Sequence, residues 1–215
     1  MHKYTILEQL HNNYLVAVVR GKSQEDAQNM IDQIIEGGIK NIEVTFTTPG
    51  AEHVIQHLQQ HADDTVVIGA GTVLDAHTAR IAILNGAKYI VSPNFDGDIA
   101  QLCNLYSIPY LPGCGSVTEI TDALKSGVDL VKVFPGDVLG SDFINAVHGP
   151  IPNVAMMPSG GVSIDNMDEW YQKGAYAIGI GGGLTKGAKD GSDNIIYQNT
   201  KKFVERFERI RGDKS

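Results

Sequence analysis

One charged residue interrupts a short apolar segment near the middle of the chain. Lys132 lies within Leu130-Val131-Lys132-Val133-Phe134-Pro135-Gly136, which alternates like a β-strand and ends at Pro-Gly. Val131 and Val133 share the face suited to packing beneath helices, so Lys132 points to the opposite, enclosed side. A buried ammonium group must be paired or lose its proton, and a neutral amine attacks carbonyl carbons. Lys132 is therefore a candidate nucleophile, although a strand lysine that only extends its amine to solvent is the ordinary alternative.

A second strand-like segment carries a carboxylate where the hydrophobic pattern expects an apolar residue. Glu43 and Thr45 alternate with Ile42, Val44 and Phe46, so the polar pair occupies the other face of the strand. Polar residues at core-facing positions break the pattern unless they serve a site. A carboxylate near a buried amine can act as a general acid and base. The alternative is a structural ion pair that fills the interior.

Eight short apolar segments alternate with amphipathic helical ones and form the scaffold for these residues. This alternation predicts a parallel sheet, and eight units favour a closed (β/α)8 TIM barrel. A doubly wound open sheet is the alternative, but its Gly-x-Gly-x-x-Gly fingerprint is missing from the first unit. No linker or change of composition divides residues 1–215, so we expect one domain. The strands are predicted at 14–19, 42–46, 65–68, 89–91, 110–111, 130–134, 154–157 and 177–180.

Polar residues gather where the predicted strands end. In a barrel these ends form one mouth, where barrel enzymes carry their chemistry. Glu43 and Lys132 belong to strands two and six, which face each other across the barrel axis, so the amine can reach the carboxylate. Desolvation favours a neutral amine and an ionised carboxylate opposes it, so we expect the two groups to titrate as a coupled pair. The other polar residues at strand ends are Arg20, Thr72, Ser92 and Ser159.

Glycine clusters follow the last two predicted strands. Gly160-Gly161 comes after the seventh strand and Gly181-Gly182-Gly183 after the eighth. Barrels often bind phosphate at this place through backbone amides, which glycine leaves open to an anion. Lys186 would add a positive charge. Either cluster alone is explained by a tight turn, but two clusters at adjacent strand ends favour a phosphate site.

Charge and composition narrow the class of partner. The 215-residue chain has a formal net charge of −8, which argues against nucleic acid and anionic membranes as partners. No apolar run reaches membrane-spanning length and the first residues lack a signal peptide core, so a cytoplasmic location is predicted. Cys103 and Cys114 are expected to be small buried side chains. The spacing of His53, His57 and His61 on an outer helix favours a solvated face over a metal site.

Six short motifs then occur in a characteristic order. With them, the chain resembles the 2-keto-3-deoxy-6-phosphogluconate (KDPG) aldolases, which include bifunctional 4-hydroxy-2-oxoglutarate (KHG) aldolases. The resemblance runs from about Tyr14 to Lys186. It implies a compact barrel with class I aldolase activity, independent of metals and cofactors, usually trimeric and belonging to the Entner–Doudoroff pathway. The motifs are Ile42-Glu43-Val44-Thr45, Gly69-Ala70-Gly71-Thr72-Val73, Ser92-Pro93, Pro112-Gly113, Val131-Lys132-Val133-Phe134-Pro135 and Pro158-Ser159-Gly160-Gly161-Val162.

The resemblance also implies roles for single residues. Lys132 matches the Schiff-base lysine and Glu43 the general acid and base. Thr72 matches a residue that holds the pyruvate carboxylate, while Gly160 and Gly161 match backbone donors to the substrate phosphate. Ser159, Gly181 and Gly182 are expected to complete the phosphate site, and the mouth is expected to include Thr45, Ser92, Pro93 and Phe134.

Two positions depart from the family pattern. Thr47 stands where well-known members carry an arginine that grips the carboxylate, and we expect Arg20 to substitute for it. Gly182 stands where members often have a serine that contacts phosphate.

The implied reaction is the reversible cleavage of KDPG to pyruvate and glyceraldehyde 3-phosphate, or of KHG to pyruvate and glyoxylate. One alternative is an aldolase for an epimeric substrate of the phosphogalactonate type. Another is a metal-dependent aldolase on a similar barrel. The third is a sugar-phosphate-binding barrel without chemistry, in which Lys132 is an electrostatic clamp.

Overall fold

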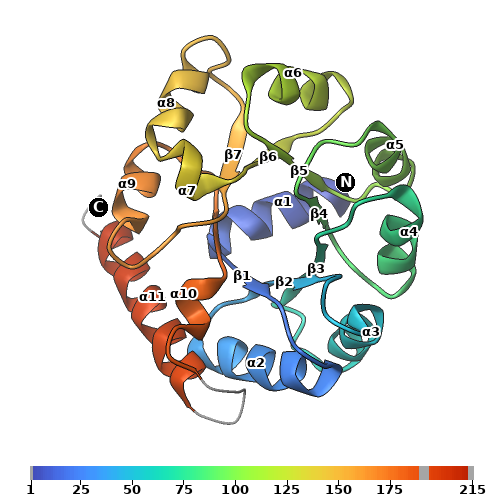
Figure 1. Cartoon of the computed structure of the whole chain (residues 1–215), viewed down its shortest axis with the longest axis vertical. Coiled ribbons are helices and arrows are strands. Elements are labelled where there is room, and N and C mark those ends of the chain that lie inside the picture. The colour runs from blue at the N-terminus through green and yellow to red at the C-terminus, as the bar shows by residue number, and fades with distance from the viewer. Residues whose placement is uncertain (1, 189–193, 213–215) are drawn as a thin grey trace.

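Eight parallel strands form the centre of the molecule in the computed structural model, which describes residues 2–188 and 194–212 (Figure 1). The sheet has the order β7-β6-β5-β4-β3-β2-β1-β8, and a bridge between Ser159 and Gly179 brings β7 next to β8. The predicted (β/α)8 barrel is therefore confirmed. The predicted single domain also includes residues 1, 189–193 and 213–215, which lie outside the described residues. The strands are β1 Leu15–Val19, β2 Asn41–Thr45, β3 Val67–Gly71, β4 Ile90–Ser92, β5 Tyr110–Cys114, β6 Leu130–Val133, β7 Ala155–Pro158 and β8 Ile178–Ile180.

Helices surround the barrel as an outer ring (Figure 1). None of the helices within the described ranges is long and apolar enough to cross a membrane. The short α7 and α10, at the ends of β6 and β8, were not predicted. The ring consists of α2 Gln24–Gly37, α3 Ala51–His61, α4 Ala76–Leu84, α5 Gly97–Leu105, α6 Val117–Lys125, α7 Gly136–Leu139, α8 Asp142–His148, α9 Met167–Gln172, α10 Gly182–Thr185 and α11 Ile195–Gly212.

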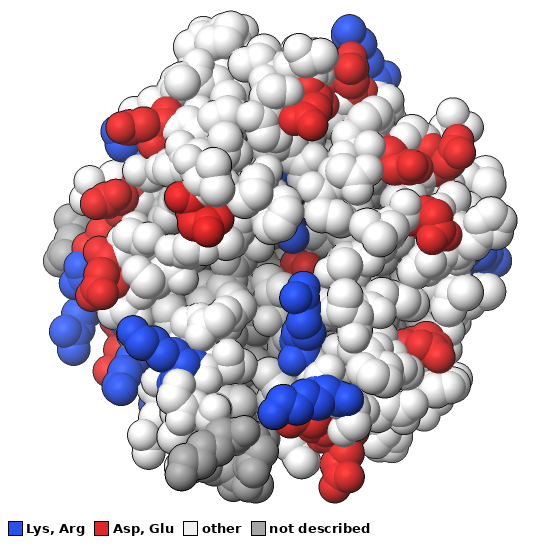
Figure 2. All heavy atoms as spheres, in the orientation of Figure 1, with Lys and Arg blue, Asp and Glu red and all other residues white. Residues whose placement is uncertain are grey.

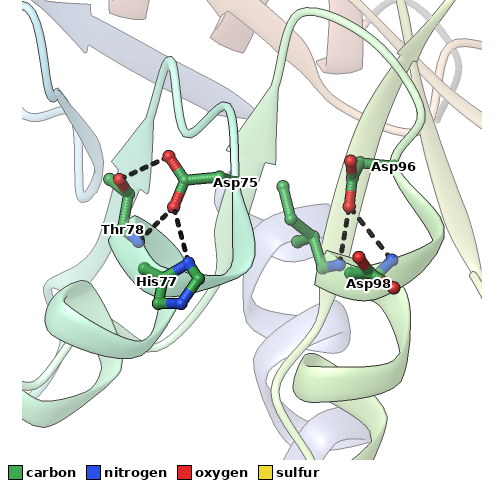
Figure 3. Close-up of polar contacts among 6 residues, drawn as sticks. Asp75, His77, Thr78, Asp96 and Asp98 are labelled. Carbon is green, nitrogen blue, oxygen red and sulfur yellow. Dashed lines mark hydrogen bonds and ion pairs between the residues drawn. The ribbon is translucent and has the colours of Figure 1, made fainter.

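Side-chain caps fix where the helices begin. The Asp75 carboxylate accepts a hydrogen bond from the Thr78 amide at 2.7 Å, and the Asp96 carboxylate accepts one from the Ile99 amide at 2.9 Å (Figure 3). Such caps satisfy amides that have no partner within the helix. Asp75 lies three residues after Thr72, so its cap also restrains the loop that carries Thr72 to the mouth.

The strands separate two apolar layers as their alternation predicts. Ile42, Val44, Val131 and Val133 pack outward beneath the helices. Leu130 packs inward, in a smaller cluster that fills the lower half of the barrel. Glu43 and Thr45, on the inward face of β2, are completely buried.

An N-terminal helix, α1 His2–Asn13, was missed by the sequence analysis. It crosses behind the strands in Figure 1, and its residues Ile6 and Leu10 join the inner cluster. The buried Asn41 side chain donates a hydrogen bond to the Leu10 carbonyl oxygen at 3.2 Å, which attaches the helix to β2. Its apolar stripe is narrow because it covers only the opening at the end of the barrel opposite the mouth. The helix closes that end against water.

The bounds of β3 and β5 differ from the prediction by more than one residue, and those of the other strands by one residue. β3 was predicted at 65–68 but spans Val67–Gly71, so its two glycines lie in the strand and not in a turn. β5 continues through Pro112-Gly113 to Cys114, and β7 includes Pro158. Proline keeps a φ compatible with an extended strand and loses only one amide donor, which makes it a weaker stop signal here than predicted.

The contribution of α1 to the core is testable by truncation of Leu10, which is completely buried. Leu10→Ala should lower the free energy of unfolding by about 2–5 kcal/mol because it leaves a cavity in the inner cluster. Tyr4→Ala on the same helix is the matched control, since Tyr4 is 65% exposed. Equal urea midpoints for the two variants would contradict a structural role for α1.

Candidate active site

A cavity of about 760 Å³ opens at the carboxyl ends of the strands. Figure 2 shows that this face is hollowed at its centre, with basic side chains around the hollow and most acidic side chains toward the periphery. The volume suits a small ligand. The predicted site residues that line the cavity are Arg20, Glu43, Thr72, Pro93, Lys132, Phe134, Ser159, Gly160, Gly161, Gly181 and Gly182, together with Lys186.

Lys132 and Glu43 meet across the barrel axis. The Lys132 Nζ atom lies 4.0 Å from Glu43 Oε1, within ion-pair range and beyond hydrogen-bond length. Lys132 is 6% exposed and Glu43 is completely buried. The amine also lies 4.9 Å from the centre of the Phe134 ring, which covers one side of it. Amine and carboxylate therefore lie together at the inner end of the cavity, with little surface exposed to solvent.

The Glu43 carboxylate has no hydrogen-bond partner at either oxygen. Burial raises its pKa, and the positive charges of Lys132 and Arg20 partly oppose that rise. A carboxyl group in this environment changes its protonation at a higher pH than in water, which suits proton transfer. Its free oxygens are available to a ligand in the cavity.

Glycine in β3 makes room for this carboxylate. A Cβ atom at Gly71 would collide with Glu43 Oε1 and Cδ. In the register between β2 and β3, Gly71 pairs with Thr45. This pair lies two residues closer to the mouth than the pair formed by Glu43 and Gly69. The position admits no side chain while Glu43 keeps its orientation.

Thr72 has an unusual backbone conformation directly after β3. Its φ is +54°, in the left-handed region that a β-branched residue seldom adopts. Such a conformation costs on the order of 1–3 kcal/mol and is typical of residues held in place at functional sites. It directs Thr72 to the cavity beside Glu43 and Lys132.

The glycine clusters form the wall of the cavity on the side of β7 and β8. Gly160 and Gly161 have positive φ values of +93° and +71°. A Cβ atom at Gly161 would also collide with the Asp137 backbone, so this turn requires glycine. Gly182 differs, because a Cβ atom there would meet no atom within 4 Å. Packing therefore does not exclude a side chain at Gly182.

Three predicted mouth residues lie near the cavity without lining it. The Thr45 and Thr47 hydroxyls lie 2.9 Å apart and share a hydrogen bond, and Thr47 is exposed. The Ser92 hydroxyl lies 2.5 Å from the Tyr110 hydroxyl and donates to the Asn94 carbonyl oxygen. These hydroxyls form hydrogen bonds with other hydroxyl groups or with the nearby backbone.

The sequence analysis missed Gly69, Gly71 and Tyr89 as residues that shape the site. Both glycines were placed after the end of the third predicted strand. Gly-x-Gly within a strand places both residues on one face, and that spacing was the available signal.

The remaining polar candidates lie away from the mouth. His53, His57 and His61 are exposed on α3, as expected. Cys103 and Cys114 are free and buried, and burial raises the pKa of both thiols to about 12. Within residues 2–188 and 194–212, no group of three histidine, cysteine or acidic side chains is placed to hold a metal ion.

The raised pKa of Glu43 predicts a pH dependence of stability. A carboxyl group with a higher pKa in the folded than in the unfolded protein stabilises the fold at low pH. That contribution is lost as the pH rises from the unfolded value near 4.5 through the folded pKa, at no more than about 1.4 kcal/mol per pH unit. The free energy of unfolding of Glu43→Gln, relative to that of wild type, should therefore increase as the pH rises.

Urea unfolding between pH 4 and 8 checks this difference. Glu36→Gln, on the exposed face of α2, is the matched control and should follow wild type. A constant difference between Glu43→Gln and wild type across this range would contradict the raised pKa.

Comparison with known proteins places the chain in a family. A family model described as "Aldolase: KDPG and KHG aldolase" matches residues 6–197. The 2-dehydro-3-deoxy-phosphogluconate aldolase of Treponema pallidum (strain Nichols) is 37% identical over 167 residues, which cover 77% of this chain and 79% of that protein.

Solved structures agree with this assignment. One described as "Native KDPGal structure" superposes with a TM-score of 0.85 and 26% identity, covering 92% of this chain and 96% of its own. The KDPG aldolase of Legionella pneumophila, with pyruvate captured as a covalent carbinolamine intermediate, has a TM-score of 0.80 and 26% identity, covering 95% and 97%. This chain therefore belongs to the KDPG and KHG aldolase family.

Proposed function

We propose that this chain is a class I aldolase that cleaves KDPG to pyruvate and glyceraldehyde 3-phosphate through a Schiff base on Lys132. The observation that carries the proposal is the pairing of a nearly buried lysine with a completely buried carboxylate at the closed end of the mouth cavity. The pyruvate carbinolamine in the related Legionella pneumophila structure supports the same covalent chemistry.

Lys132 supplies the electron sink. Its neutral amine attacks the C2 ketone, and the resulting carbinolamine loses water to give an iminium. The C4 hydroxyl loses its proton as the C3–C4 bond breaks, and the electron pair of that bond passes to the iminium as an enamine. The aldehyde then leaves, the enamine is protonated at its terminal carbon, and water hydrolyses the imine to release pyruvate. Each step needs a proton carrier at the amine.

Glu43 is the proposed proton carrier. It lies 4.0 Å from the Lys132 amine, so one water or substrate oxygen to the side of both groups can hydrogen-bond to each. Both of its oxygens lack partners, and burial raises its pKa above the usual range of a carboxyl group, which favours its taking and returning a proton. A protonated Glu43 also avoids holding the amine as an ammonium ion, so the pair can populate its neutral form.

Positive charge in the cavity matches the two anionic ends of the substrate. Arg20, Lys132 and Lys186 line the cavity, where Glu43 is the acidic residue. Arg20 acts electrostatically on Glu43, so it is near enough to bind the substrate carboxylate together with Thr72. Arg20 thus takes the role that Thr47 leaves unfilled. The phosphate is assigned to the wall formed by Ser159, Gly160, Gly161, Gly181 and Gly182 with Lys186.

A second candidate substrate follows from Gly182. The site holds no hydroxyl at this position although a side chain would fit, so the phosphate depends on backbone amides and Lys186. Weaker phosphate binding favours KHG, which has no phosphate, as a further substrate. The KDPGal structure supports a phosphogalactonate-type substrate as the other alternative. The cytoplasmic location stays a prediction from the sequence.

Reductive trapping tests the covalent step. Borohydride with pyruvate should add the reduced pyruvate mass to Lys132 in wild type and leave Lys132→Arg unmodified, because guanidinium cannot form the imine. Arg20→Gln should still be trapped but need a higher pyruvate concentration, with Thr47→Ala as the control that matches wild type. Peptide mass spectrometry gives the site. Modification at another lysine, or none, would support the sugar-phosphate-binding alternative.

A cleavage assay that measures released pyruvate tests the substrate. KDPG should be cleaved with a higher kcat/KM than its unphosphorylated form. Gly182→Ser should lower KM for KDPG roughly 2- to 10-fold, the effect of one added hydrogen bond. Gly97→Ser is the matched control, because Gly97 is likewise open but lies on α5. Equal kcat/KM with and without phosphate would contradict the assigned phosphate site, and loss of activity in EDTA would favour the metal-dependent alternative.

We further propose a homotrimer assembled through an apolar surface on α4 and α5. The side chains of Leu84 and Leu105 are 67% and 74% exposed there, and the Arg80 guanidinium stacks over Tyr106 at 4.1 Å to join the two helices. Exposed apolar patches of this kind mark protein interfaces. The surface consists of Leu74, Ile81, Leu84, Leu105 and Tyr106.

Sedimentation equilibrium should give three times the chain mass. Leu84→Glu should shift the protein toward monomer because it places a charge in the interface. Val138→Glu is the control, since Val138 is 77% exposed but lies on α7, outside the patch. A monomeric wild type would contradict this assembly.

A further inference from the structure

Tyr89 carries a buried hydroxyl that the mechanism above does not use. It immediately precedes β4, is completely buried and belongs to the inner cluster. Its hydroxyl has no hydrogen-bond partner. A buried tyrosine hydroxyl ordinarily has a partner, so one left without it requires an explanation.

The Tyr89 ring and the Glu43 carboxylate lie against neighbouring positions on the same face of β3. A Cβ atom at Gly69 would collide with the hydroxyl-bearing end of the Tyr89 ring, and one at Gly71 would collide with Glu43 Oε1. Alternate residues of a strand are about 7 Å apart along one face. The phenol therefore lies below the carboxylate, on the side away from the mouth. Both oxygens of Glu43 lack partners as well.

Few charges act in this part of the barrel. Lys132 from β6 and Arg20 from the end of β1 act on Glu43 from the mouth side. Burial raises the pKa of Tyr89 first, and the Glu43 charge raises it further, which places the two groups within electrostatic range. The hydrophobic side chains of the inner cluster around Tyr89 come from the strands and from α1. Tyr89 is thus a buried titratable group within electrostatic range of Glu43, on the side away from the mouth.

We propose that Tyr89 is a positioning residue for Glu43, and that its hydroxyl donates to the ionised carboxylate through one enclosed water that bridges the two groups. The proposal rests on the proposed role of Glu43 and adds the group that tunes it. A donor to the ionised form lowers the pKa of a buried carboxyl group. Lys132 and Arg20 stabilise the same form from above, but a bound anionic substrate screens them. The phenol is neutral and enclosed, so its effect persists when the cavity is occupied.

Tyr89→Phe removes only the hydroxyl and tests this role. The exchange of pyruvate methyl protons with deuterium, followed by NMR across pH, reports the proton transfer assigned to Glu43. Without the donor, the Glu43 pKa rises and the acid limb of the exchange profile should move up by about 0.5–1 pH unit, a 3- to 10-fold loss below the limb. The final yield of borohydride trapping on Lys132, measured above the limb where Glu43 is ionised in both proteins, should be unchanged because the amine is intact.

Tyr14→Phe is the matched control. Tyr14 is also a buried tyrosine with an unpartnered hydroxyl, but its ring stacks on Phe207 at 4.6 Å, outside the barrel interior. Its exchange profile should coincide with wild type. A Tyr89→Phe profile that coincides with wild type, or that moves no further than the Tyr14→Phe profile, would overturn the proposal.

A second measurement separates this proposal from the proposed function. In urea unfolding across pH 4–8, Tyr89→Phe should lose stability more steeply than wild type as Glu43 ionises, and the extra loss should vanish in the Glu43→Gln background. This readout needs no substrate, so it still decides the coupling if wild type neither traps pyruvate nor exchanges its protons. An extra loss of equal size in both backgrounds would show that the hydroxyl acts on stability without Glu43.

Discussion

The central constraint in this protein is the confinement of one amine and one carboxylate at the inner end of a cavity, where little of either group is exposed to solvent. Lys132 and Glu43 are 4.0 Å apart, and neither group is more than a few percent exposed. In such a place two full charges are costly to desolvate, although they attract each other strongly. Sharing one proton between the two groups lowers that cost. The same arrangement places a carboxyl group that can carry a proton beside the amine.

The rest of the barrel maintains this confinement. Inner apolar residues fill the space beneath the pair, and α1 closes the end of the barrel that the strands alone leave open. The glycines of β3 let Tyr89 and the Glu43 carboxylate approach the strand backbone, which no larger residue would allow. The capped loops and the left-handed Thr72 then bring polar groups over the opening. Each feature either removes water from the interior or directs a polar group toward it.

Much of this was predictable because the decisive residues break the hydrophobic pattern. A lysine between two valines, and a glutamate between an isoleucine and a valine, are enough to indicate an interior site. The number and spacing of the βα units predicted the barrel. Arg20 and the glycine clusters were found from their places at strand ends.

The features that were missed have no distinctive local pattern. The α1 helix has a narrow apolar stripe, which acquires a role only when the open end of a barrel is available to it. Gly69-Ala70-Gly71 has the composition of a turn, and only pairing with β2 shows that it is a strand. Tyr89 is an ordinary aromatic residue for a strand. Its importance depends on the missing hydrogen-bond partner of its hydroxyl, which is evident only in the folded structure.

The closure of one end by α1 also constrains the order of events. The cavity opens at the mouth, and Lys132 lies at its inner end, so whatever is bonded to Lys132 is the innermost part of the substrate. The fragment beyond the broken bond must depart before the attached three-carbon fragment can be freed. In the reverse direction, the keto acid must enter first, because an aldehyde already seated above the amine would block its path. The single opening thus imposes an order on binding and release, and it results from the closure of the other end by α1, which contacts neither fragment.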